Sequence, residues 1–215
     1  MLSVIIPAHN EEQYLLPTLQ SLRKQSYADF EVIVVCDGCT DKTPQLANKY
    51  AEKVLILKER QGPAAARNAG ARLALGETLV FLDADTHPSP DVLTFIAKQT
   101  DVIGTCKITP DPPKIKHKIM MGLKNVLMCP FGVSNGIIFT PKKLFTAVGG
   151  FGAFQKGEDG HFIRKVKKSG TKFVLLSTPV LNSMRRIEQK GYFGVWTYWI
   201  QHPFTKGEQP YEVIR

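Results

Sequence analysis

Two aspartates and a histidine follow an apolar run in the middle of the chain. Residues 79–82 are apolar and lead into Asp83-Ala84-Asp85, with His87 two positions further on. Such a run, closed by turn-forming residues, is typical of a buried parallel strand, and ligands bind at the carboxyl ends of such strands in open α/β sheets. Alternate residues of an extended chain point the same way, so Asp83, Asp85 and His87 can face one cation.

Two carboxylates at this spacing repel one another unless a cation or a proton lies between them. A divalent metal that also binds phosphate oxygens is the simplest ligand that relieves the repulsion. The alternative is a helix N-cap beside a solvated acid, because Asp-x-Asp is a common sequence. The spacing alone leaves both interpretations open.

The composition of the 215 residues indicates one globular domain. Hydrophobic residues make up 43% of the chain, which is enough for a sizeable core. No apolar run reaches the roughly 18–20 residues that a membrane-spanning helix needs, and the first residues lack the basic start of a signal peptide. Four cysteines in a chain of this length do not indicate a disulfide framework. These features predict a cytoplasmic protein.

Charge is distributed unevenly along the chain, whose formal net charge is +9. Residues 1–100 contain 10 Lys and Arg against 12 Asp and Glu, whereas residues 101–215 contain 18 against 7. The second half is therefore expected to meet an anionic partner such as nucleic acid, phospholipid headgroups or a phosphorylated substrate. A basic surface that serves only solubility is the alternative.

The first half alternates strands and helices. Strands are expected at residues 2–6, 30–36, 53–58 and 79–82, with Pro7 ending the first, and helices at residues 10–25, from 43 onward and at 63–75. This alternation predicts an α/β fold with a mostly parallel central sheet flanked by helices and with right-handed crossovers. Asp37, the turn at residues 60–63 and the Asp83/Asp85 pair all follow strands, so they can converge on one crevice.

Other fingerprints are missing or weak. Neither a G-x-G-x-x-G after the first strand nor a G-x-x-x-x-G-K-[ST] is present. Cys36 and Cys39 form a C-x-x-C at a strand-to-helix turn, where a redox pair would lie. A zinc ribbon needs a second such pair, and Cys106 and Cys129 stand alone. A buried core residue at Cys36 is the favoured interpretation.

Four segments, in this order and spacing, resemble family 2 glycosyltransferases of the GT-A (Rossmann-like) fold: VIIPAHNEE, VVCDGCTDKT, GPAAARNAG and FLDAD. The second segment usually reads VDDGSTD in that family, and this chain keeps Asp37 and Gly38 but has Cys36 and Cys39. The resemblance implies an inverting enzyme that binds a nucleoside-diphosphate sugar in its first half. It also implies a divalent metal, Mn²⁺ or Mg²⁺.

The resemblance further implies roles for individual residues. Asp37 is expected to hold the nucleobase edge, beside backbone of Pro7 and Ala8. Asp85 is expected to bind the metal, with Asp83 near the ribose or the metal and His87 as a further ligand that favours Mn²⁺. The residues expected to bind the donor are Pro7, Ala8, Asn10, Glu11, Asp37, Arg67, Asp83, Ala84, Arg185 and Arg186.

A second acid pair, Glu158 and Asp159, lies on a glycine-flanked turn before an expected helix that carries Arg164. The resemblance implies that Asp159 is the general base that takes the proton of the acceptor hydroxyl, with Glu158 as its orienting neighbour or the second choice. The alternative is that both acids only interact with the helix dipole. The four preceding segments favour catalysis.

Residues 114–128 form an expected basic amphipathic helix after a strand ending at residue 108 and a loop at 109–113. Ile115, Ile119, Leu123 and Val126 recur at helical spacing among lysines. This pattern is typical of a membrane-surface element or an acceptor-binding flap. A helix packed on the core with a solvated basic face explains it equally well.

The C-terminal residues 187–215 are expected to form an aromatic extension. Tyr192, Phe193, Trp196, Tyr198 and Trp199 resemble an interfacial anchor that contacts the inner face of the cell membrane. The alternative is a helix packed back on the core. Residues 1–100 are then the donor-binding half of a single domain, and residues 101–186 are its acceptor-binding and catalytic half.

The sequence therefore predicts metal-dependent transfer of a hexose to a glycan or lipid-linked acceptor, without nucleic acid as a partner. Two rival functions remain. A sugar-phosphate nucleotidyltransferase would need a glycine-rich loop after the first strand, which this chain lacks. A non-catalytic basic protein that binds lipid or nucleic acid is the second rival, and the acids gathered at the strand ends argue against it because they would repel such an anionic ligand.

Overall fold

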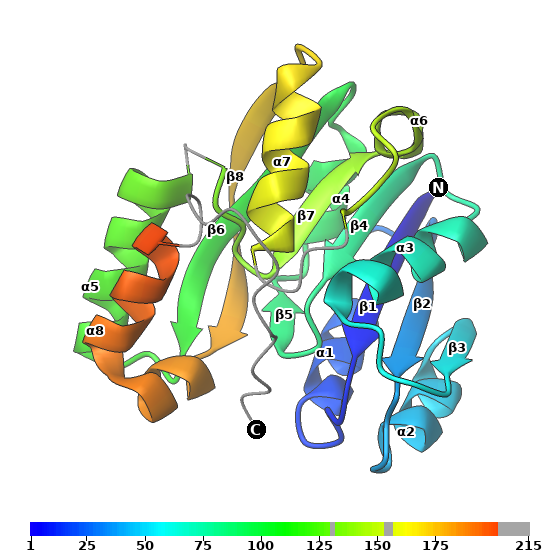
Figure 1. Ribbon diagram of the computed structural model, residues 1–215, viewed down its shortest axis with the longest axis horizontal. Coiled ribbons are helices and arrows are strands. Elements are labelled where there is room, and N and C mark those ends of the chain that lie inside the picture. Colours follow the sequence, from blue (N-terminus) through cyan, green and yellow to red (C-terminus); the bar gives the residue numbers. More distant parts are fainter. Residues whose placement is uncertain (130–131, 153–156, 202–215) are drawn as a thin grey trace.

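The computed structural model describes residues 1–129, 132–152 and 157–201. Its strands form one eight-stranded sheet, and helices lie against both faces (Figure 1). The strands are β1 (Leu2–Ala8), β2 (Phe30–Asp37), β3 (Lys53–Leu57), β4 (Thr78–Leu82), β5 (Thr86–Pro88), β6 (Val102–Asp111), β7 (Ile137–Pro141) and β8 (Lys172–Ser183). The helices are α1 (Leu15–Leu22), α2 (Thr43–Tyr50), α3 (Pro63–Leu73), α4 (Val92–Ala97), α5 (Ile115–Leu123), the π-helix η1 (Lys124–Met128), α6 (Lys142–Ala147), α7 (Glu158–Lys168) and α8 (Arg185–Gln201).

The strand order is β3-β2-β1-β4-β7-β6-β8-β5. The pairings among β1, β2, β3 and β4 are all parallel, which confirms the expected arrangement of the first half. The sheet as a whole is mixed, because β7 runs antiparallel to β4 and β6, and β5 runs antiparallel to β8. The carboxyl ends of β1, β2 and β4 therefore meet at one edge of the sheet.

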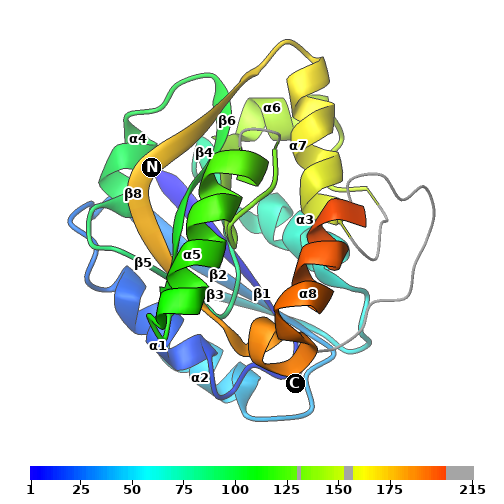
Figure 2. The same ribbon diagram turned by 90° about the vertical axis from the view of Figure 1, so that its left-hand side faces the viewer.

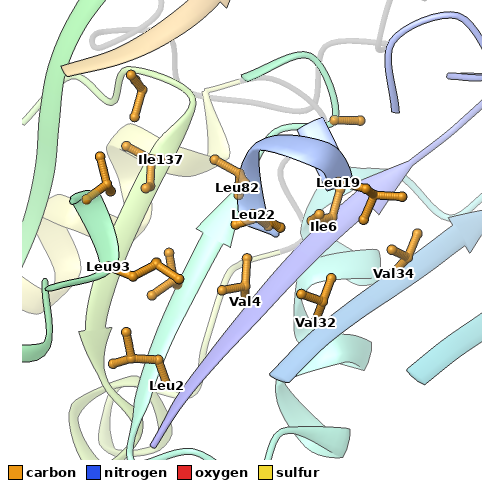
Figure 3. Packing of buried hydrophobic residues seen from close by; sticks show 14 of the residues in the cluster. Leu2, Val4, Ile6, Leu19, Leu22, Val32, Val34, Leu82, Leu93 and Ile137 are labelled. Atoms are coloured by element: carbon orange, nitrogen blue, oxygen red, sulfur yellow. The ribbon is translucent and has the colours of Figure 1, made fainter. Parts of the chain in front are cut away.

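Successive residues of β1 contribute to two different cores. Val4 and Ile6 pack with Leu19 and Leu22 of α1 on one face of the sheet (Figure 3). Ile5, between them, belongs to a second core built from α3, α6 and α7 on the other face. Because both faces of β1 are covered, its residues 4–6 are apolar in succession instead of alternating with polar ones.

Two prolines that were expected to interrupt strands lie inside them. Pro7 is part of β1 and pairs in register with Val35. The hydrogen-bonded ladder between β1 and β4 ends at Ile5, so beyond that residue β1 has a neighbouring strand on one side only. A proline, which has no backbone N–H, can therefore be accommodated there. The loop expected at residues 109–113 is also wrong in part, because β6 continues through Pro110 alongside β8.

The first helix begins later than expected, at Leu15. Asn10 has a positive φ of 55°, and its side chain accepts a hydrogen bond from the Thr40 backbone N–H at 2.8 Å. The Glu12 carboxylate accepts one from the Lys42 N–H at 3.0 Å. The parallel strands bring the loops after β1 and β2 together, so these residues fix the second loop instead of starting a helix.

A small separate core lies under α5 and α8, which run beside each other in both views (Figures 1 and 2). Met120 and Met121 of α5 pack there with Val195 of α8 and with Ile108 of β6. The apolar stripe of residues 115–126 is exposed, so the interpretation that packs this stripe on the core is wrong.

The helix α8 is kinked at Gly191, where φ is 70° and ψ is 167°. The side chains of Trp196, Tyr198 and Trp199 and all of residues 202–204 lie outside the described residues, so the aromatic anchor stays a prediction. Among the described residues, no helix combines the length and the apolar character needed to cross a membrane.

Candidate active site

A cavity of about 650 Å³ opens at the carboxyl ends of β1, β2 and β4. The residues expected to bind the donor all line it except Asn10, and so do Asp85 and the acid pair at the start of α7. The structure thus brings together side chains that the sequence places up to 179 positions apart, from Pro7 to Arg186. His87 is not part of the cavity wall.

The Asp37 carboxylate, at the end of β2, fixes the turn that follows β3. Its Oδ1 accepts the Gln61 N–H and its Oδ2 accepts the Gly62 N–H, each at 2.7 Å. The next residue, Gly38, has φ +61°, and a Cβ there would lie 2.6 Å from the Arg60 backbone nitrogen. A carboxylate offers about four acceptor sites, so these two bonds leave Asp37 capacity to accept from a ligand N–H.

Arg67 of α3 joins the two acid pairs. Its guanidinium lies 2.8 Å from Asp83 Oδ1, 2.8 Å from Glu158 Oε1 and 3.2 Å from Asp159 Oδ1. Only 4% of Arg67 is exposed, and the Phe151 ring lies 5.4 Å from the guanidinium. Arg67 was expected to bind the donor directly. It lines the cavity, as that prediction requires, and its position also makes it the buried counter-ion of the cavity acids.

One guanidinium does not neutralise this group of carboxylates. Burial raises the pKa of Asp83 to about 7, against the lowering effect of Arg67 and with a further rise from Asp159 and Asp85. Burial and the neighbouring Asp159 also raise the pKa of Glu158. Three carboxylates share the one guanidinium of Arg67 at this end of the cavity, and such an arrangement favours a bound cation or a proton.

Asp159 is the more accessible acid of its pair, with 20% of its side chain exposed against 10% for Glu158. Its Oδ2 accepts a hydrogen bond from the Ser134 hydroxyl at 2.6 Å. Its buried Oδ1 makes no hydrogen bond within the described part of the chain. Asp159 is therefore oriented by Ser134 at one oxygen and paired with Arg67 at the other, and it lines the cavity, as a general base must.

Arg185 bridges two further acids that line the cavity. It donates to both oxygens of Glu11, at 2.9 and 2.8 Å, and its Nε lies 3.0 Å from Asp85 Oδ2. The guanidinium also lies over the Tyr14 ring at 4.3 Å. Arg186 lines the same cavity. Both arginines expected to bind the donor therefore line the cavity, with Arg185 held by carboxylates.

The expected trio of metal ligands is only partly assembled. The chain is not extended across these residues, because residues 84–85 form a turn in which the Thr86 N–H donates to the Asp83 carbonyl oxygen at 3.1 Å. Across the described ranges no group of three or more His, Cys, Asp or Glu side chains is placed to hold a metal ion. The two carboxylates of Asp83 and Asp85 suit a hard cation that takes its other ligands from phosphate and water. His87 lies outside this set.

Two contributors to the site escaped the sequence analysis. Ser134 has no signal beyond its place in a Ser-Asn-Gly turn. Lys124 lies on the buried side of η1 in the cavity wall, where burial lowers its pKa to about 8. The lysine-rich stretch around it resembles a solvated face, so nothing marks Lys124 as the one that turns inward. Cys36 is buried as expected, and all four cysteines are free.

Residues 3–157 match the family described as Glycosyl transferase family 2. The chain is 35% identical over 109 residues to the putative glycosyltransferase EpsH of Bacillus subtilis, which covers 47% of this chain and 32% of that protein. It is 40% identical over 99 residues to the poly(ribitol-phosphate) beta-N-acetylglucosaminyltransferase TarS of Staphylococcus aureus, covering 42% of this chain and 17% of TarS. The chain thus spans a third or less of the length of these two curated relatives.

Two solved structures share the fold. A TarS fragment in complex with UDP-GlcNAc superposes with a TM-score of 0.71 at 24% identity, covering 85% of this chain and 58% of that chain. The mannosyltransferase PcManGT from Pyrobaculum calidifontis, in complex with GDP-Man and Mn²⁺, gives 0.74 at 23% identity, covering 94% and 61%. These likenesses show the GT-A fold. Because the family match extends over more than half of the residues, the chain belongs to glycosyltransferase family 2.

Proposed function

We propose that this chain transfers a hexose from a nucleoside-diphosphate sugar to a glycan or lipid-linked acceptor, with inversion at the anomeric carbon. The observation that carries the proposal is the position of Asp159. It is oriented by Ser134 and lies on the same cavity as Asp37, Asp83 and Asp85. One cavity thus combines a base with the acids expected to hold a nucleotide and its metal.

The donor occupies the end of the cavity formed by β1, β2 and β4 in this proposal. Asp37 accepts a hydrogen bond from the nucleobase edge, while its two hydrogen bonds from the backbone N–H groups of residues 61 and 62 keep that turn in place. Pro7 and Ala8 line the same cavity. The two solved structures described above contain UDP-GlcNAc and GDP-Man, which supports a nucleotide sugar as the donor class. Residues 1–100 form the donor half and residues 101–186 the acceptor half.

A divalent metal fits the acid-rich wall through Asp85, with Asp83 as the second carboxylate. Mn²⁺ is present in the PcManGT complex, and Mg²⁺ suits the same oxygen ligands. When bound, the metal supplies neutralisation of the diphosphate charge. Arg185 and Arg186 line the same cavity and can add positive charge beside the departing diphosphate. For this, Arg185 gives up its contact with Asp85 and binds a phosphate oxygen in its place.

Transfer requires one base and one displacement. Asp159 takes the proton of the acceptor hydroxyl while the hydroxyl oxygen forms the new bond to the anomeric carbon. The bond from that carbon to the diphosphate oxygen breaks in the same step, and the nucleoside diphosphate leaves. Asp159 keeps the proton, so no covalent enzyme intermediate is needed and the configuration inverts.

The test compares Asp159→Asn with Asp91→Asn, an exposed acid next to α4. Calorimetry with a panel of nucleoside-diphosphate sugars and Mn²⁺ or Mg²⁺ identifies the donor, and release of nucleoside diphosphate to water measures turnover without a known acceptor. We expect Asp159→Asn to retain donor affinity and to lose roughly 10²-fold or more in turnover. Unchanged turnover would refute the base, and pyrophosphate release from a nucleoside triphosphate would indicate the nucleotidyltransferase instead.

A cytoplasmic location and the lipid linkage of the acceptor remain predictions of the sequence.

A further inference from the structure

Five apolar residues of α5 and η1 are exposed. The outer stripe, as we call it, consists of Ile115, Ile119, Leu123, Val126 and Leu127, with exposed fractions of 76%, 60%, 42%, 70% and 53%. Single exposed apolar side chains are ordinary, but five in a row along about three turns of helix form a continuous patch. Such patches mark interaction sites.

Packing on the opposite side of α5 fixes this orientation. Met120 and Met121 are buried in the small core that α5 shares with α8, and Lys124 points into the cavity wall. His117 is also buried, with its Nδ1 3.1 Å from the Pro112 carbonyl oxygen and its ring 5.7 Å from that of Tyr192. Rotating the helix to hide the outer stripe would expose these contacts.

Lysines border the outer stripe. Lys116 and Lys118 are exposed on α5, on either side of the row that begins with Ile115 and Ile119. Lys114 is exposed as well, and its Nζ lies 3.0 Å from Glu188 of α8. An apolar centre with basic borders matches the pattern of a helix that lies in the plane of a membrane surface.

The neighbouring helix α8 carries an exposed aromatic side chain. Figure 2 shows α5 and α8 side by side. Phe193 of α8 is 82% exposed. Aromatic rings are favoured at the depth of lipid headgroups, where one end is apolar and the other is wet.

We propose that the outer stripe is a docking surface for an anionic lipid bilayer. The five apolar side chains and Phe193 would enter the boundary between headgroups and acyl chains, and Lys116 and Lys118 would contact anionic headgroups. Burial of the apolar atoms and attraction between opposite charges act together there. The proposal rests on the fold and the exposed residues, and it stands whether or not the chain transfers a sugar.

Docking in this way would bring the cavity to the membrane. Leu127 belongs to the outer stripe and also lines the cavity, beside Met128 of the same π-helix. An apolar surface therefore continues from the outside of α5 to the wall that contains Asp159. A ligand held in the headgroup layer would reach the cavity without leaving the bilayer surface.

The experiment measures flotation of the chain with vesicles of phosphatidylcholine, alone or mixed with phosphatidylglycerol. The apolar variant is Ile115→Ser with Ile119→Ser, and its control is Leu75→Ser, which removes a side chain of similar exposure, 70%, outside α5 and α8. We expect the apolar variant to bind mixed vesicles at least about tenfold more weakly than the wild type. The control should bind as the wild type does.

The charge variant is Lys116→Gln with Lys118→Gln, which keeps the apolar residues. Its control is Lys58→Gln with Lys168→Gln, two exposed lysines outside α5 and α8. We expect the charge variant to lose roughly thirtyfold on mixed vesicles, the control to lose nothing, and added salt to weaken wild-type binding. Circular dichroism of each variant shows whether it retains the helix content of the wild type.

Three results would overturn the proposal. One is a wild type that binds neither kind of vesicle. Another is that the wild type binds neutral and anionic vesicles equally well and that the charge variant binds both kinds as the wild type does. The third is self-association in light scattering that the apolar variant abolishes, because the stripe would then be an interface between two copies. Donor affinity, measured on the same variants, should stay unchanged in every case and separates this surface from the sugar-transfer site.

Discussion

Replacing Arg67 by methionine tests whether one buried guanidinium holds the acids of the cavity in place. Methionine keeps an unbranched apolar stem beside Phe151 and removes the charge. The change removes the two guanidinium nitrogens that lie 2.8 Å from Glu158 Oε1 and 2.8 Å from Asp83 Oδ1. Arg72 provides the matched control, because it lies on the same helix and is exposed.

The expected loss follows from burial. Removing one partner of a buried ion pair costs about 3–5 kcal/mol, since the other charge stays buried without compensation. Glu158, with 10% of its side chain exposed, is in this regime, whereas Asp83 is 38% exposed and adds less because water screens it. We expect the free energy of unfolding near neutral pH to fall by about 3–5 kcal/mol for Arg67→Met and by no more than about 0.5 kcal/mol for Arg72→Met.

The loss also depends on pH in a defined direction. Burial already raises the pKa of Glu158 in the wild type, and Arg67 opposes that rise. Without Arg67 the pKa of Glu158 moves further above its unfolded value of about 4.3, so the folded variant binds a proton that the unfolded chain does not. The difference in stability between variant and wild type is therefore largest above the raised pKa and shrinks as the pH falls through it.

Denaturant unfolding of the metal-free chain over a pH series measures this difference, with the slope of the transition as a check that the unfolded state is unchanged. A second readout is the acid limb of donor hydrolysis, which should move to higher pH in Arg67→Met. The reasoning is refuted if the loss of stability is the same at every pH, or if it does not exceed that of Arg72→Met. Arg67→Lys, which keeps the charge with a different shape, should recover part of the stability.

Three further changes have outcomes fixed by the structure. Asp85→Ala should abolish the dependence of donor affinity on Mn²⁺ in calorimetry, and an affinity that still depends on Mn²⁺ would exclude Asp85 as a ligand. Ser134→Ala removes the 2.6 Å hydrogen bond to Asp159 and should reduce turnover while donor affinity is retained; loss of both together would argue for a structural role instead. Gly104→Ala places a Cβ against the Phe139 ring and the Val174 side chain inside the core and should cost about 1–3 kcal/mol by denaturant unfolding. Gly122→Ala, which meets nothing within 4 Å on α5, is the control and should be neutral or stabilising.

The sequence was sufficient where a signal is local. Apolar runs followed by Asp37 and Asp83 are properties of neighbouring residues, so the parallel strands and the carboxylates at their ends could be predicted from them. The order of four short segments was enough to indicate the family. Helix starts were less certain, because Asn10 and Glu12 suit a helix N-terminus equally well but bond to the loop after β2 instead.

The tertiary structure decided which side of each element is buried and which charges meet. Hydrophobic periodicity finds the apolar face of α5 but does not say which face the rest of the protein covers, and here that face is exposed while Lys124 is buried. The partners of Arg67 are equally invisible in sequence, because Glu158 lies 91 positions away and the two meet only when α3 and α7 pack against the same face of the sheet. Composition and spacing along the chain therefore determined the strands and the acids at their ends. The folding of distant segments onto one sheet determined that Arg67 serves those acids and that the outer stripe meets solvent.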